Sequence, residues 1–121
     1  SFEIRKGFGI MILTVMYRSN SSMQAIRAVD ILNIYRAMRK EPLSPSASKL
    51  MNLDDLPDWC KEAMNKHIIH IHRDSIQKGK ITPFPEDGRN IGDSGYVVYE
   101  DGKVNLYSDE SFHRKFTIER W

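Results

Sequence analysis

At 121 residues, the chain is long enough to bury one hydrophobic core and too short for two. Hydrophobic residues make up 40% of it and charged residues 28%, as in an ordinary globular domain. Its 18 basic and 16 acidic residues leave a formal net charge of +2, which argues against a surface that is basic throughout, as nucleic-acid binders often have. We therefore expect one domain over residues 1–121.

The cysteine count and the apolar runs bear on the cellular compartment. A single cysteine, Cys60, excludes an intramolecular disulfide and is compatible with the reducing cytoplasm. The longest apolar run, residues 7–17, is well short of the roughly 20 residues that span a bilayer. We predict a cytoplasmic protein with no membrane partner. The first residue, Ser1, is compatible with a native start, a tag remnant or a domain boundary.

The first half of the chain predicts one strand and one helix. Residues 8–17 are large and apolar on both alternating faces, which favours a central strand. Residues 23–40 contain no glycine or proline and are rich in helix formers, which predicts a largely buried helix. Residues 42–48 hold two prolines and three serines, so we expect a loop there.

A second helix is predicted from about residue 56 to residue 78. Pro57 suits its first turn, and Gly79 is a natural C-terminal stop. Its apolar stripe would include Cys60, which we interpret as a small core residue and not as a nucleophile. Residues 80–94 follow as an irregular connection.

The clearest local signal is a hairpin near the C-terminus. Residues 96–100 and 103–107 flank Asp101 and Gly102, and this dipeptide favours a type I′ turn. A two-residue turn places Tyr99 opposite Val104, so that one face of the hairpin is apolar. A last strand is predicted for residues 112–121. The result is an α+β fold of order β-α-α-β-β-β, a mainly antiparallel sheet with two helices packed on one face.

No cofactor is predicted, and the metal signal is weak. His67, His70 and Asp74 would share one face of the second helix, the spacing of a zinc or iron site or of an acid–base pair. Standard zinc motifs are absent, so we predict no metal site and regard these three as the only candidates.

A basic group near the C-terminus supports an alternative function. His113, Arg114 and Lys115, together with Arg89, could contact an RNA backbone. The predicted element order resembles that of small ribosome-dependent mRNA-cleaving toxins, and residues 95–99 are similar to their middle strand. This resemblance implies RNA cleavage, with the basic residues at 113–115 in catalytic roles.

Our first hypothesis is nevertheless a non-enzymatic protein-binding domain. One candidate partner is a bacterial toxin, which the domain would inhibit as an immunity-type protein. Exposed aromatic residues are typical anchors of protein interfaces, and a nuclease partner would require an acidic patch. The predicted partner-binding residues are Asp54, Asp55, Asp58, Trp59, Glu62, Tyr107 and Trp121.

Overall fold

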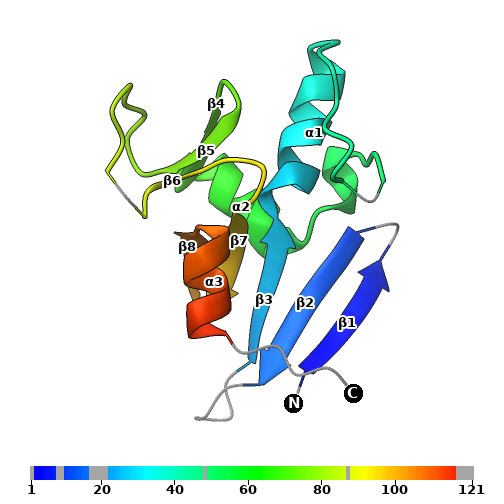
Figure 1. Ribbon diagram of the computed structural model, residues 1–121, viewed down its shortest axis with the longest axis vertical. Helices are drawn as coiled ribbons and strands as arrows, with labels where there is room; N and C mark the ends of the chain where they lie inside the picture. The colour runs from blue at the N-terminus through cyan, green and yellow to red at the C-terminus, as the bar shows by residue number, and fades with distance from the viewer. Residues whose placement is uncertain (1, 8–9, 17–21, 48, 87, 117–121) are drawn as a thin grey trace.

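The computed structural model describes residues 2–7, 10–16, 22–47, 49–86 and 88–116, with side chains from Met23 onward. It confirms an α+β fold with antiparallel sheets, but the predicted order of elements is only partly matched. The described strands form a large sheet of order β1-β2-β3-β7-β8 and a small sheet of order β4-β5-β6 (Figure 1). The elements are β1 (Phe2–Gly7), β2 (Ile10–Met16), β3 (Ser22–Arg27), α1 (Ala28–Met38), η1 (Leu53–Asp55), α2 (Asp58–Asn65), β4 (Ile69–His72), β5 (Ser75–Lys78), β6 (Asn90–Ile91), β7 (Tyr96–Glu100), β8 (Lys103–Tyr107) and α3 (Asp109–Lys115).

The predicted first helix begins later than expected, because residues 23–27 belong to a strand. Its opening residues form β3, which pairs with β2 on one side and β7 on the other, and α1 begins only at Ala28 (Figure 1). Met23 and Ala25 pack in one core and Ile26 in another, so alternation and not helical periodicity governs this segment. The prediction was wrong here because small apolar residues such as Ala25 suit both structures.

The C-terminal hairpin is confirmed in its turn and its register. Tyr99 pairs with Val104, and Glu100 pairs with Lys103. Asp101 and Gly102 both have positive φ, at 49° and 75°, as a type I′ turn requires.

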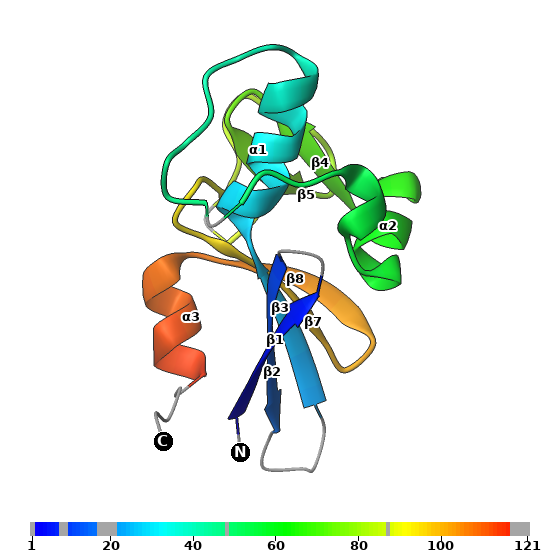
Figure 2. The same cartoon turned by 90° about the vertical axis from the view of Figure 1, so that its right-hand side faces the viewer.

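The predicted packing is partly matched: α1 and α2 share one core with the large sheet, whereas α3, where a strand was predicted, covers the opposite face. Val97 and Leu106 belong to the core beneath α1 and α2, whereas Val98 packs with Phe112 and Phe116 at α3. Figure 2 shows α2 and α3 on the two sides of strands β3, β7 and β8. The hairpin is therefore buried on both faces.

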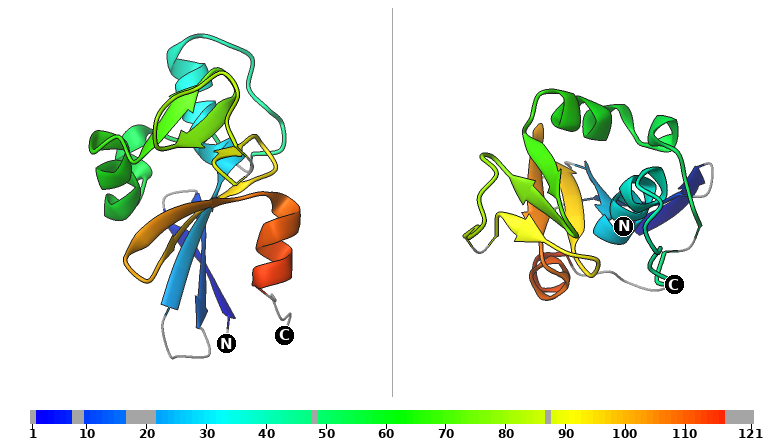
Figure 3. Two further views of the ribbon diagram at one scale, coloured as in Figure 1. Left: turned by 90° about the vertical axis from the view of Figure 1, so that its left-hand side faces the viewer. Right: turned by 90° about the horizontal axis from the view of Figure 1, so that it is seen from above.

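The predicted second helix stops after two turns. Its C-cap is Lys66, and His67 then adopts a positive φ of 59°. The chain continues as the β4–β5 hairpin, in which Ile71 pairs with Ile76, so the second half of the predicted helix was wrong. In the left view of Figure 3 this hairpin lies above β7 and β8.

The predicted last strand was also wrong for its described part. Residues 109–115 form α3, and the Ser108 hydroxyl caps the helix by accepting a hydrogen bond from the Ser111 amide at 3.1 Å. Asp109 and Glu110 occupy its first turn, in keeping with the helix dipole. Residues 117–121 lie outside the described part of the chain.

A buried arginine joins α1 to two distant turns. Arg36, only 7% exposed, places Nε 3.3 Å from Asp74 Oδ1 and Nη2 2.9 Å from Asp93 Oδ1. Its Nη1 also donates to Asn33 Oδ1 at 3.0 Å. These contacts fix the β4–β5 turn and the approach to β7 against the last turns of α1.

Substitution of Gly95 by alanine is expected to destabilise the fold. A Cβ atom at Gly95 would lie 2.6 Å from Ile91 Cβ and 3.0 Å from the Tyr107 carbonyl oxygen, so backbone must move. We expect a loss of about 1–3 kcal/mol in the free energy of unfolding, measured with urea. Gly92→Ala is the matched control, because its nearest neighbour would be 3.9 Å away. Equal stability of the two variants would contradict the close approach at Gly95.

Asp30 makes stability depend on pH. This residue of α1 is 2% exposed, and neither carboxylate oxygen has a hydrogen-bond partner among the described residues. Burial raises its pKa above the ordinary 3.8, against the opposing charge of Arg27. The folded state thus holds the Asp30 proton more tightly than the unfolded state, whose pKa is the ordinary 3.8. The contribution of Asp30 to the free energy of unfolding therefore falls as the pH rises from 3.8 through the raised pKa of the folded state. We expect Asp30→Asn to be more stable than the parent at pH 7 and to flatten this part of the pH profile; Asp54→Asn, at an exposed position, is the matched control. A stability advantage of Asp30→Asn over the parent that shrinks as the pH rises over this range would show the sign to be wrong.

Candidate functional site

A groove lies between α2 and the tip of the β7–β8 hairpin. Its cavity has a volume of about 340 Å³. The two walls come from segments more than 30 residues apart in sequence, which the large sheet brings together. Aromatic and aliphatic side chains form most of the interior, with charged side chains at the edge; the lining residues are Trp59, Glu62, Ala63, Lys66, Ile68, Lys78, Tyr99, Gly102, Lys103 and Val104.

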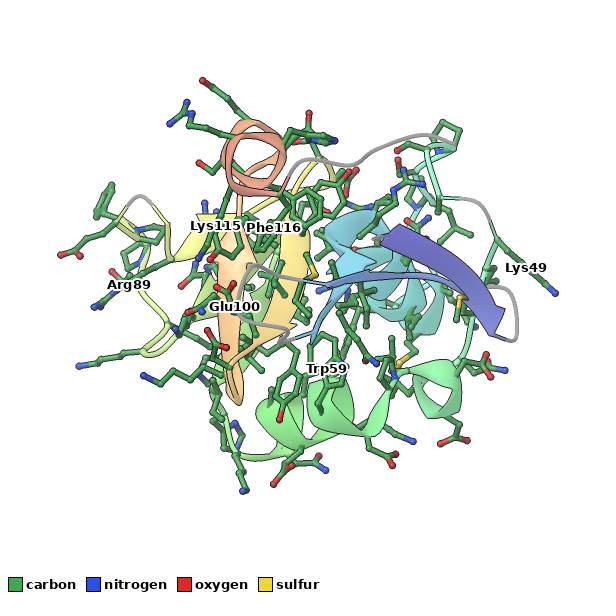
Figure 4. All side chains as sticks on the ribbon, turned by 90° about the horizontal axis from the view of Figure 1, so that it is seen from below. Lys49, Trp59, Arg89, Glu100, Lys115 and Phe116 are labelled. Atoms are coloured by element: carbon green, nitrogen blue, oxygen red, sulfur yellow. The ribbon has the colours of Figure 1, made fainter. Side chains whose placement is uncertain are left out.

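Trp59 is the fixed wall of this groove. Its ring stacks on Tyr99 with centroids 5.3 Å apart and planes 17° apart. Its indole Nε1–H donates to Gln24 Oε1 at 2.7 Å, so the polar atom of the side chain is satisfied while the ring stays half-buried. Cys60, the next residue of α2, is fully buried and holds the helix against the core. Figure 4 shows Trp59 between α2 and the strands.

The edge of the groove carries more positive than negative charge. Glu62 and Lys66 form an exposed ion pair of 2.6 Å one turn apart on α2. Lys78 donates to the neutral Asn105 Oδ1 at 2.7 Å, and Lys103 makes no ion pair within the described residues. Three lysines therefore face one glutamate.

The predicted partner-binding residues are not all in one place. Trp59 and Glu62 line the groove, whereas the three aspartates of the set lie outside its lining, on η1 and the start of α2. Asp55 accepts a hydrogen bond from the Asn52 amide at 3.1 Å and caps η1, and Asp58 lies 3.6 Å from Lys61. Trp121 falls outside the described residues.

Tyr107, the remaining predicted partner-binding residue, belongs to a polar network on the opposite face. Its hydroxyl donates to the Glu100 carboxylate and accepts from Lys115 Nζ at 2.8 Å. Glu100 Oε1 also accepts from Lys115 Nζ at 3.3 Å and from Asn105 Nδ2 at 3.1 Å. Burial, followed by the bond to Glu100, raises the pKa of Tyr107, and the Tyr107 bond raises that of Lys115. A phenol and an ammonium that both hold their protons more tightly are poorly suited to acid–base catalysis at neutral pH.

The four predicted RNA-contact residues are each engaged with an acid and do not form a cluster. On α3, His113 Nδ1 lies 3.2 Å from Asp109, and Arg114 lies 2.6 Å from Glu110. Arg89 is 4.0 Å from Glu86 and precedes β6, whereas the other three residues belong to α3.

The fold brings two of the three weak metal candidates together and pairs the third with an arginine. His67 follows α2, His70 lies on β4, and Asp74 sits in the β4–β5 turn, where it pairs with Arg36. The His67 and His70 rings stack with centroids 5.5 Å apart. The helical face on which they were predicted to meet does not exist. Within the described part of the chain, no group of three His, Cys, Asp or Glu side chains is placed to hold a metal ion.

Sequence reasoning missed half of the groove. Ile68 reaches it because α2 ends at Asn65 and the chain then turns into β4, whereas Gly102 and Lys103 reach it through the packing of the β7–β8 hairpin beside α2. The available signal for the end of α2 was the strict alternation of isoleucine and histidine over residues 69–72, which is typical of a strand.

Cys60 is expected to behave as a core residue. Its side chain is fully buried, and burial raises the pKa of the thiol to about 12. We expect a thiol reagent at pH 8 to react on the order of 100-fold more slowly with the native protein than with the urea-unfolded protein, because reaction requires local opening. Reaction at comparable rates in the two states would restore Cys60 as a candidate nucleophile.

Comparison with known proteins adds no family: no family model, curated protein or solved structure matches this chain. Among the described residues, no helix is both long enough and apolar enough to cross a membrane.

Proposed function

We propose that this chain is a protein-binding domain that receives an apolar side chain of a partner, flanked by acidic residues, in the groove between α2 and the β7–β8 hairpin. The observation that carries this proposal is the stacked pair of Trp59 and Tyr99 in the wall of a groove edged by three lysines. Aromatic anchors surrounded by polar residues are the usual centre of a protein interface.

The groove suits a partner side chain because its walls are held in place before binding. Trp59 is fixed on two sides, by Tyr99 and by Gln24. Tyr99 and Val104 are opposite one another in a hairpin whose register is set by the turn. A preformed site loses little conformational entropy when it binds, so more of the contact energy appears as affinity.

The charge at the edge favours an acidic partner segment. Because Glu62 is already paired with Lys66, the remaining positive charge of Lys78 and Lys103 is left for the partner. Complementary charge at the rim of an interface raises the association rate and selects among partners.

Two more specific hypotheses stay predictions. A toxin partner of the nuclease type would be basic and would engage the aspartates at 54, 55 and 58, which lie outside the groove lining. RNA cleavage by the residues at 113–115 would have to overcome their pairing within α3 and with Glu100. The groove supports protein binding more directly than either one.

The test is a selection of displayed random peptides on the immobilised full-length chain. We expect enriched peptides to share an aliphatic or aromatic residue flanked by Asp or Glu. The double variant Lys66→Glu and Lys103→Glu should bind them at least about tenfold more weakly, because it reverses the charge of the rim. In a ¹H–¹⁵N spectrum of the parent, the bound peptide should shift the Trp59 indole N–H signal, which reports on the groove.

The control carries the same change in charge elsewhere: Lys40→Glu with Lys49→Glu, both exposed and outside the groove. A selection with no enriched peptide, or peptides equally weakened by the control, would contradict a groove-directed interaction. Peptides that instead lose binding on charge reversal at Asp54 and Asp58 would favour the nuclease-type partner.

A further inference from the structure

The loop between β5 and β6 exposes an aromatic ring with no role in the core. Phe84 is 89% exposed, so its ring gains almost nothing from burial on folding. Prolines precede and follow it in the sequence and restrict the backbone on both sides. An almost fully exposed ring on a restricted backbone is available to a ligand.

The loop is anchored by a buried amide side chain. Gln77 of β5 is 2% exposed; its Nε2 donates to the Thr82 carbonyl at 3.1 Å and its Oε1 accepts from the Thr82 amide at 3.0 Å. The Phe84 amide donates to Thr82 Oγ1 at 3.3 Å. At the other end of the loop, the Lys78 amide donates to the Arg89 carbonyl at 2.9 Å. Phe84 is thus presented in a defined position.

A cavity of about 260 Å³ lies beside this ring, and its lining is mostly charged or polar. Lys78, Lys80 and Arg89 contribute positive charge to it, against the single carboxylate of Glu86. The Arg89–Glu86 pair is long, at 4.0 Å, and exposed, so it holds the guanidinium only weakly. Asp87 follows Glu86 in the sequence but lies outside the described residues.

From this arrangement we infer that the β5–β6 loop binds single-stranded nucleic acid, with a base stacked on Phe84 and phosphates held by Lys80 and Arg89. Base stacking on an exposed aromatic ring beside lysine and arginine is how single strands are bound without sequence preference. The balanced charge of the whole chain does not oppose this, because the relevant charge is the local one.

The lining distinguishes this cavity from the groove at α2. A partner side chain would need apolar walls, and here Phe84 and Pro85 are the apolar members of a lining otherwise made of Gln, Lys, Thr, Glu and Arg. A nucleotide could stack its planar base on the Phe84 ring and pair its phosphate with the cations. The inference is therefore independent of the proposed protein-binding function, and either can fail without the other.

The experiment measures binding of the 121-residue chain to a labelled oligo-dT of ten nucleotides by fluorescence anisotropy at low salt. Phe84→Ala should weaken binding roughly tenfold, and Phe84→Trp should retain it, with quenching of the new tryptophan as bases stack. Lys80→Glu with Arg89→Glu should also weaken binding and reduce the dependence of log K on log salt concentration by about 1–2 units.

The controls separate this site from general charge and general apolarity. Leu50→Ala removes another exposed apolar side chain, and Lys40→Glu with Lys49→Glu matches the change in charge. Figure 4 shows Lys49 at the far side of the molecule from Arg89. Oligo-dT binding that survives Phe84→Ala unchanged, or that falls equally in the controls, would overturn the inference, as would the absence of binding by the parent. A third outcome is that the parent binds a selected peptide but no oligo-dT, and that Phe84→Ala no longer binds this peptide. That result would assign the ring to a protein partner instead.

Discussion

Burial of the β7–β8 hairpin on both faces is the constraint on which the rest of the structure depends. Val97 and Leu106 are covered by the core of α1 and α2, and Val98 is covered by the phenylalanines of α3. A strand that is buried on both faces cannot leave a charged side chain unpaired. Glu100, on the α3 face and 7% exposed, is accordingly satisfied by Asn105, Tyr107 and Lys115. The basic helix that resembled a nucleic-acid contact in the sequence thus has an internal role: one of its cations neutralises a buried carboxylate.

The elements that could be predicted are those with a dominant local signal. The hairpin was predictable in register because the Asp101–Gly102 turn and the alternation on both sides agree. The second helix was not, because isoleucine and histidine at positions 68–72 fit a helical stripe as well as a strand. The end of α2 has no glycine to mark it: His67 takes the positive φ that glycine usually supplies. The signals for α3, by contrast, were present in Ser108 and in the order of acidic and basic residues, and the aromatic alternation obscured them.

The candidate site likewise has one part that local sequence signals predict and one part that they do not. Trp59 and Glu62 could be singled out from residue type and place on a predicted helix, and they do line the groove. The opposite wall could not be inferred, because it depends on which face of the hairpin meets α2, and that is a property of the tertiary packing. The predicted histidine cluster failed for a related reason: spacing along a helix has meaning only if the helix continues, and here His70 already lies on a strand.

Lys78 links the two cavities. It lines both the groove at α2 and the cavity of the β5–β6 loop, and its ammonium donates to Asn105, which in turn donates to Glu100. A substitution there would change the electrostatics of both cavities and disturb the network that stabilises the hairpin against α3. Of these two cavities, Lys66 and Lys103 line the groove, and Lys80 and Arg89 line the loop cavity. The two proposed interactions can therefore be tested separately at these four residues, whereas Lys78 contributes to the lining of both cavities.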